Sequence, residues 1–170
     1  LTSGGWKYPP SGAGARSAEN YDQLETYRNL GFLVEKFGFT RAHPVIPKAA
    51  AFLFSFQTAA GDFRGIYGTQ YSPNYSAAIM ELLIKAGYGR DPRIARGWRW
   101  LLSIRQADGG WAIPFRTAVA GKGLTDILRA KKVEPDRARP FSHLITGVVL
   151  RAFAAGAEDF QDRDEIRMAG

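Results

Sequence analysis

The stretch Arg96-Gly-Trp-Arg-Trp-Leu-Leu-Ser-Ile-Arg-Gln-Ala-Asp-Gly-Gly-Trp111 decides the fold, because a degenerate copy of it lies upstream. The copy reads Lys48-Ala-Ala-Ala-Phe-Leu-Phe-Ser-Phe-Gln-Thr-Ala-Ala-Gly-Asp-Phe63. Both stretches hold a basic residue, a small residue, an aromatic residue, Leu, a Gln and then Gly-x-aromatic. Their glutamines, at positions 57 and 106, are 49 residues apart. A period in this range, with one supersecondary unit per repeat, is typical of stacked helical arrays.

Helical periodicity surrounds both copies. Apolar residues at helical spacing predict a first helix over residues 21–37, which Gly38 ends, and a second over about 45–57. The same order then recurs, with a helix over 75–86, a stop at Gly87 and a partner helix over 93–106. The second helix of each pair is expected to begin with a polar cap followed by Pro, at His43-Pro44 and Asp91-Pro92.

Fragments of further repeats lie at both ends of the chain. Gly4-Gly5-Trp6 matches Gly109-Gly110-Trp111, so residues 1–20 are expected to be the tail of a preceding repeat. The remaining divisions are repeat 1 at 21–63, repeat 2 at 72–111, a long connection at 112–140 with a short helix near 125–131, and the start of repeat 3 at 141–170. Stacked helix pairs bury their apolar faces only against neighbours. About two and a half repeats therefore predict that more of the same chain, or a second copy in a homo-oligomer, covers the open ends.

The repeated pattern resembles the QW motif of the terpenoid cyclase and protein prenyltransferase superfamily, which includes squalene and hopene cyclases. The resemblance implies an all-α fold, an α/α toroid of which this chain forms a partial ring of helical hairpins. It implies that the motif residues are structural staples and not catalysts: Gln57, Gly61, Phe63, Gln106, Gly109 and Trp111. Two departures stand out, since Phe63 replaces Trp and the second copy has an extra residue, Arg105, before its Gln.

Composition limits the chemistry. A 45% hydrophobic and 13% aromatic content indicates a packed core in one domain. The absence of Cys excludes disulfides and thiolate metal sites, and neither a metal nor another cofactor is expected. With no signal-peptide pattern and no long apolar run, the sequence predicts a cytoplasmic location.

The formal net charge is +7, and basic residues gather at Arg129, Lys131, Lys132, Arg137 and Arg139. A solvated face is the favoured interpretation of this 129–139 segment, and peripheral contact with an anionic membrane is the functional alternative. Nucleic acid is not expected as a partner.

Catalytic candidates are weak. Asp162-Arg-Asp164-Glu resembles the Asp-x-Asp-Asp motif of class II cyclases, but carboxylates that precede a helix also complement its dipole. Prenyltransferases of the superfamily bind Zn through Asp, Cys and His, whereas this chain has no Cys and only two His. Of these, His143 is the better functional candidate, because its helix is expected to line a central cavity.

The main functional hypothesis is an apolar cavity for an isoprenoid or other apolar small molecule. Its expected aromatic wall comprises Tyr67, Tyr71, Tyr75, Phe115 and Phe141, although aromatic residues at such spacing more often pack a core. Two alternatives remain open from the residues. One is a non-catalytic helical-repeat scaffold, and the other is a polysaccharide lyase-like toroid enzyme that uses Tyr, His143 and Arg in a polar groove.

Overall fold

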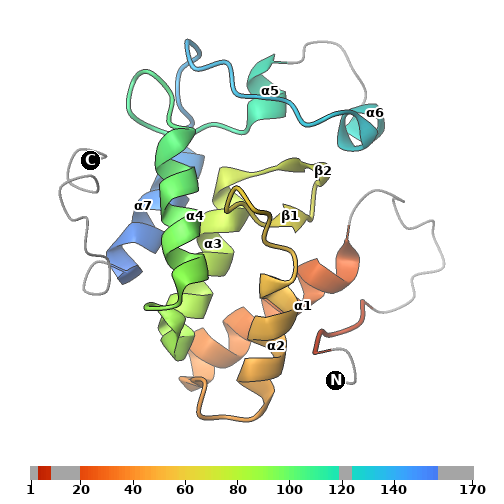
Figure 1. The fold of residues 1–170 in the computed structure, drawn as a ribbon, viewed down its shortest axis with the longest axis vertical. Helices are drawn as coiled ribbons and strands as arrows, with labels where there is room; N and C mark the ends of the chain where they lie inside the picture. The colour runs from red at the N-terminus through yellow and green to blue at the C-terminus, as the bar shows by residue number, and fades with distance from the viewer. Residues whose placement is uncertain (1–3, 9–19, 119–123, 157–170) are drawn as a thin grey trace.

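In the computed structural model, which describes residues 4–8, 20–118 and 124–156, the helices form two rows. One row holds α1 (Tyr21–Gly31), α3 (Pro73–Leu83) and α7 (His143–Gly156), with α3 in the middle and in contact with both neighbours. The other row holds α2 (Val45–Phe54), which packs on α1, and α4 (Pro92–Ser103), which packs on α3. Figure 1 shows α2 and α4 on the viewer's side, with the first row behind them. The described residues are mostly helical, as the sequence predicts.

Two helices of the first row end in the same way. A π-helical turn follows each, η1 (Phe32–Lys36) after α1 and η2 (Ile84–Tyr88) after α3. Gly38 and Gly87 then take φ values of +65° and +99°, which L side chains rarely adopt. The predicted glycine stops are confirmed.

The start of α4 also follows the sequence signal. Asp91 caps the helix by accepting a hydrogen bond from the Arg93 N–H at 2.9 Å, and Pro92 occupies the first turn. The helix α2 begins at Val45, whose N–H donates to His43 Nδ1 at 3.4 Å.

A single apolar core fills the space between the rows. Trp98 of α4 stacks on Phe153 of α7 with ring centroids 4.4 Å apart, so the two helices share one layer of packing. The largest fully buried side chains come from both rows, from the segment between α2 and α3, and from the turn after α4: Leu30, Ile46, Leu53, Tyr71, Ile79, Met80, Leu83, Ile94, Trp98, Leu101, Trp111 and Phe153. Burying such side chains is the main favourable contribution to folding.

One element was not expected from the sequence. A short hairpin, β1 (Arg64–Gly65) and β2 (Gly68–Tyr71), occupies the connection between the two helix pairs. Gly65 and Gly68 have φ values of +121° and +58°, and this conformational freedom allows the reversal. The residues do not alternate between apolar and polar side chains over the length of a strand, so periodicity alone does not reveal the hairpin.

The described part of the long connection carries two short helices, α5 (Pro114–Ala118) and α6 (Leu124–Arg129). Both lie above the helices of the two rows in Figure 1. The predicted short helix near residues 125–131 corresponds to α6. Gln70 is 2% exposed and holds the end of α6, since its Nε2 donates to the Ile127 carbonyl at 2.8 Å and its Oε1 accepts from the Val133 N–H at 2.9 Å.

Candidate functional site

A pocket of about 410 Å³ opens on the helices of the first row. Its floor is α3, its long wall is α1 with η1, and its third side is Arg151 of α7. The lining residues are Tyr27, Arg28, Gly31, Phe32, Glu35, Lys36, Ala78, Glu81, Leu82 and Arg151. Ligand pockets in proteins commonly measure ~300–1,000 Å³, so the pocket has room for a small molecule.

Small residues let the floor and the long wall approach each other. A Cβ at Gly31 would lie 3.3 Å from Leu82 Cδ1, which is tighter than ordinary contact. Ala78, one turn before Leu82 on the same helix, is 6% exposed. The groove between α1 and α3 therefore depends on the missing side chain at Gly31 and on the small methyl side chain at Ala78.

A buried carboxylate, Glu81, is one of the lining residues of the pocket. Glu81 is 2% exposed, and its two oxygens bind Lys85 Nζ at 2.6 Å and Arg151 Nε at 2.8 Å. Lys85 also reaches Glu35 at 3.0 Å. This four-member ion network joins the π-helical turns η1 and η2 to α3 and α7, and so links all three helices of the first row.

The ion pairs of the network raise the pKa values of its two cations. The hydrogen bond to Glu81 is the largest cause that raises the pKa of Lys85, and the same carboxylate raises the pKa of Arg151. Burial raises the pKa of Tyr27, an effect that Arg151 opposes and that Glu35 and Glu81 reinforce. At neutral pH Lys85 and Arg151 are therefore both protonated beside Glu81, and the Tyr27 phenol keeps its proton.

The structure brings three of the five expected aromatic residues together. Tyr67 contacts both Tyr75 and Phe115, with ring centroids 5.2 and 5.5 Å apart. Tyr75 in turn contacts Tyr27 at 6.1 Å. Tyr27 is thus shared between this aromatic cluster and the pocket, whereas the other three rings do not line the pocket.

The other expected site residues lie elsewhere. Tyr71 is 2% exposed, packs against Trp100 with centroids 5.2 Å apart, and donates to Glu134 Oε2 at 3.1 Å. Burial, followed by the Glu134 charge, raises the pKa of the Tyr71 hydroxyl. Phe141 contacts the exposed His143 ring at the start of α7. Asp162 and Asp164 lie outside the described residues.

The Gly-x-aromatic segments share one geometry. The aromatic N–H donates to a hydroxyl of the following first-row helix in each case. The bonds are Trp6 to Thr26 at 2.9 Å, Phe63 to Ser76 at 3.1 Å and Trp111 to Thr146 at 2.9 Å. The glycine two residues earlier has positive φ in each, at Gly4, Gly61 and Gly109.

Two of these glycines also lie against the next helix of the second row. A Cβ at Gly4 would lie 2.7 Å from the Lys48 carbonyl oxygen, and one at Gly61 would lie 2.5 Å from that of Arg96. Lys48 and Arg96 are equivalent positions in the two sequence copies. The turn that ends one repeat therefore packs on the first half of the next second-row helix.

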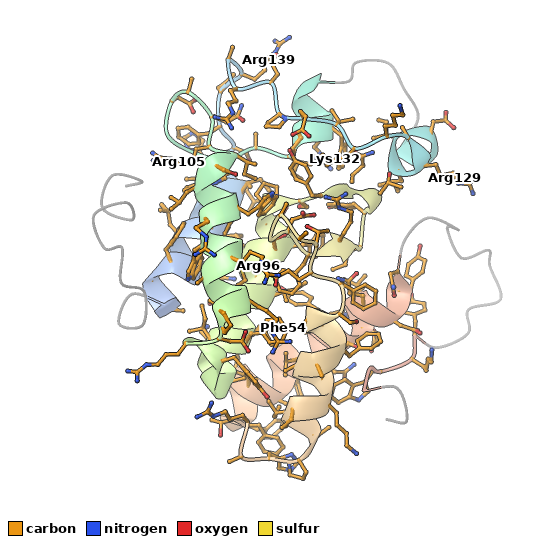
Figure 2. The ribbon with its side chains drawn as sticks, in the orientation of Figure 1. Phe54, Arg96, Arg105, Arg129, Lys132 and Arg139 are labelled. Atoms are coloured by element: carbon orange, nitrogen blue, oxygen red, sulfur yellow. The ribbon has the colours of Figure 1, made fainter. Side chains whose placement is uncertain are left out.

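The basic segment 129–139 is exposed, but several of its charges have partners. Lys132 pairs with Glu134 at 2.6 Å, Arg139 pairs with Asp136 at 3.3 Å, and Arg137 donates to the Ser103 carbonyl. Figure 2 shows Arg129, Lys132 and Arg139 spread along this edge of the molecule, and not gathered at one point.

The Glu81 network is the feature of the candidate site that the sequence analysis missed. The one available signal is a carboxylate inside the apolar run from Ala77 to Ile84, followed by Lys85 one turn later. Arg151, at 60% side-chain exposure, gives no comparable signal, because its contact with Glu81 spans 70 residues.

Two further observations concern the described part of the chain. None of its helices has the length and apolarity that crossing a membrane requires. Within the same residues, no group of three or more His, Asp or Glu side chains is placed to hold a metal ion.

Comparison with known proteins gives two partial similarities. The chain is 29% identical over 99 residues to a probable squalene–hopene cyclase of Sinorhizobium fredii, which covers 56% of this chain and 15% of that protein. It is 32% identical over 113 residues to a terpene cyclase–glycosyl transferase fusion protein of Humicola fuscoatra, which covers 64% of this chain and 8% of that protein. The chain therefore spans only a small part of the length of these relatives.

No family model matches the sequence, and no solved structure matches the fold. The chain has a distant, terpenoid cyclase-like relationship to these proteins over part of its length.

Proposed function

We propose that the chain forms part of a terpenoid cyclase-like α/α toroid, in which α1, α3 and α7 are inner helices and α2 and α4 are outer helices. The inner helices of such a ring face its centre, and the pocket is the site where they bind an isoprenoid-type small molecule. The single observation that carries this proposal is that every lining residue of the pocket belongs to the first row or its π-helical turn.

The apolar half of the pocket suits an isoprenoid chain. Gly31, Ala78 and Leu82 line the groove, and the Phe32 ring is 53% exposed at its edge. An exposed ring beside a concave surface is a common mark of a binding site. Tyr27 extends this surface towards the cluster of Tyr67, Tyr75 and Phe115.

Titration with farnesol, a neutral isoprenoid alcohol, tests the proposal. We expect the backbone amide signals of Gly31, Ala78 and Leu82 to shift in a ¹H–¹⁵N spectrum of the full chain. Ala78→Phe fills the groove and should remove these shifts. Ala51→Phe, at an exposed position of α2, is the matched control and should leave them unchanged.

The polysaccharide lyase-like alternative calls for a polar groove with Tyr, His143 and Arg. Tyr27 and Arg151 line the pocket, whereas His143 does not. An acidic oligosaccharide in the same titration separates the two functions. Shifts at the pocket residues with the oligosaccharide, and none with farnesol, would replace the isoprenoid proposal with the lyase-like one.

A further inference from the structure

We propose that the pocket selects an amphiphile whose head group is a single carboxylate, received by the guanidinium of Arg151. This inference rests on the proposed function, because the apolar tail of the ligand would occupy the groove assigned to the isoprenoid chain. The inference adds to the proposed function the charge and the shape of the ligand's head group.

The charges around the pocket leave a small positive excess. Four cations surround it: Arg28, Lys36, Lys85 and Arg151. Three carboxylates oppose them, since Glu81 and Glu35 pair within the network and Glu25 lies 3.8 Å from Arg28. One positive charge therefore remains, which matches a monoanion better than a polyanion.

Arg151 has the geometry to receive that monoanion. It binds Glu81 through Nε, at one edge of the guanidinium, and its side chain is 60% exposed at the pocket. The two terminal nitrogens of a guanidinium form a planar fork that matches a carboxylate in a bidentate arrangement. The ion pair with Glu81 orients the guanidinium of Arg151.

Tyr27 supplies a hydroxyl donor at the same place. Tyr27 lines the pocket together with Arg151, Glu35 and Glu81. Because burial raises the pKa of Tyr27, the hydroxyl keeps its proton at neutral pH and is able to donate a hydrogen bond to an anion.

The position of the pocket along its helices disfavours a polyphosphate head. The lining residues of α1 and α3 lie in the middle or the second half of each helix, and the others lie in η1 and at Arg151 of α7. Polyphosphate sites commonly use the N-terminus of a helix, and no lining residue occupies such a position. A guanidinium pair with one carboxylate does not need that support.

Three ligands with one tail and different heads test the inference on the full chain: farnesoic acid, farnesol and farnesyl diphosphate. We expect the carboxylate to bind about tenfold more tightly than the alcohol, as charge-assisted hydrogen bonds permit. Arg151→Gln should reduce farnesoic acid to the affinity of farnesol. Arg151→Lys keeps a charge beside Glu81 but removes the fork, so it should retain the fold and lose most of the preference.

Arg99→Gln makes the same charge change at an exposed position of α4 and serves as the control, with no expected effect. Circular dichroism of each variant separates loss of binding from loss of folding. Equal binding of the acid and the alcohol, or an acid preference that survives Arg151→Gln, would overturn this inference and leave the proposed function standing. Tightest binding of the diphosphate would also overturn it, and binding of none of the three would remove both proposals.

Discussion

The side-chain nitrogen of Gln57 lies 2.8 Å from the carbonyl oxygen of Arg93, so the turn that ends α2 is bound to the first turn of α4. The same nitrogen binds the Gly61 carbonyl at 3.0 Å within its own turn. Gln106 occupies the equivalent place in the next repeat, but its Nε2 binds the carbonyls of Asp136 and Arg139, both at 2.8 Å. The long connection therefore supplies the carbonyl acceptors for Gln106, whereas the first turn of α4 supplies one for Gln57.

Replacing Gln106 should destabilise the protein through this contact. Gln106→Leu keeps the volume of the side chain but removes two hydrogen bonds, and we expect the free energy of unfolding to fall by about 2 kcal/mol. Urea denaturation followed by circular dichroism measures the change. An unaltered midpoint would show that the connection does not depend on this glutamine.

Replacing Gln23 should have the opposite effect on stability. It is fully buried in α1, and neither Nε2 nor Oε1 has a hydrogen-bond partner. A buried amide without partners carries a desolvation cost, so Gln23→Leu should raise the free energy of unfolding by about 1 kcal/mol. The same denaturation experiment checks the sign, and a loss of stability would reveal that an internal water satisfies this amide.

The hydroxyl that follows each Gly-x-aromatic segment should also contribute to stability. Thr146→Val is nearly isosteric and leaves the Trp111 N–H without its acceptor, at a cost of about 1–2 kcal/mol. Thr40→Val is the control, because Thr40 is exposed and only accepts a long 3.4 Å bond. Equal midpoints for the two variants would contradict a structural role for the repeated bond.

The helices were predictable because their signals are local. Apolar spacing sets the positions of α1, α3 and α4, and Gly38 and Gly87 mark the ends of α1 and α3 within a few residues. The Asp91 cap and Pro92 are likewise visible in consecutive residues. The β1–β2 hairpin escaped prediction because two glycines, and not a strand pattern, determine it.

The pocket was not predictable for a different reason. Its charges come from three helices, and Glu81 meets Arg151 only after α7 packs against α3. Aromatic content drew attention to Tyr71 and Phe141, which contact the long connection and the start of α7 instead. Composition identifies residues of a suitable type, whereas packing decides which of them share a surface.

The Asp91 cap predicts a dependence of stability on acid. The hydrogen bond from Arg93 lowers the pKa of Asp91 in the folded state, relative to about 3.9 in an unfolded chain. Its contribution is therefore present above the unfolded pKa and is lost as the pH falls through the folded pKa. Asp91→Asn retains a capping oxygen but no charge, so it should reduce stability at pH 7 and have a smaller effect at pH 3. Thermal unfolding at both pH values measures this, and an equal effect at both would exclude the ion pair as the cause.

Glu81 is the most buried charged residue that lines the pocket. Glu81→Gln should lower the free energy of unfolding by about 2 kcal/mol, less than the ~3–5 kcal/mol typical when a fully buried pair is broken. The reason is that Lys85 and Arg151 are 39% and 60% exposed and are able to turn into water. Glu35→Gln removes the exposed carboxylate of the same network, at 52% exposure, and should cost at most about 0.5 kcal/mol. A double-mutant cycle with Arg151→Gln isolates the coupling between the two helices, and a coupling near zero would mean that α3 and α7 are held together by apolar packing alone.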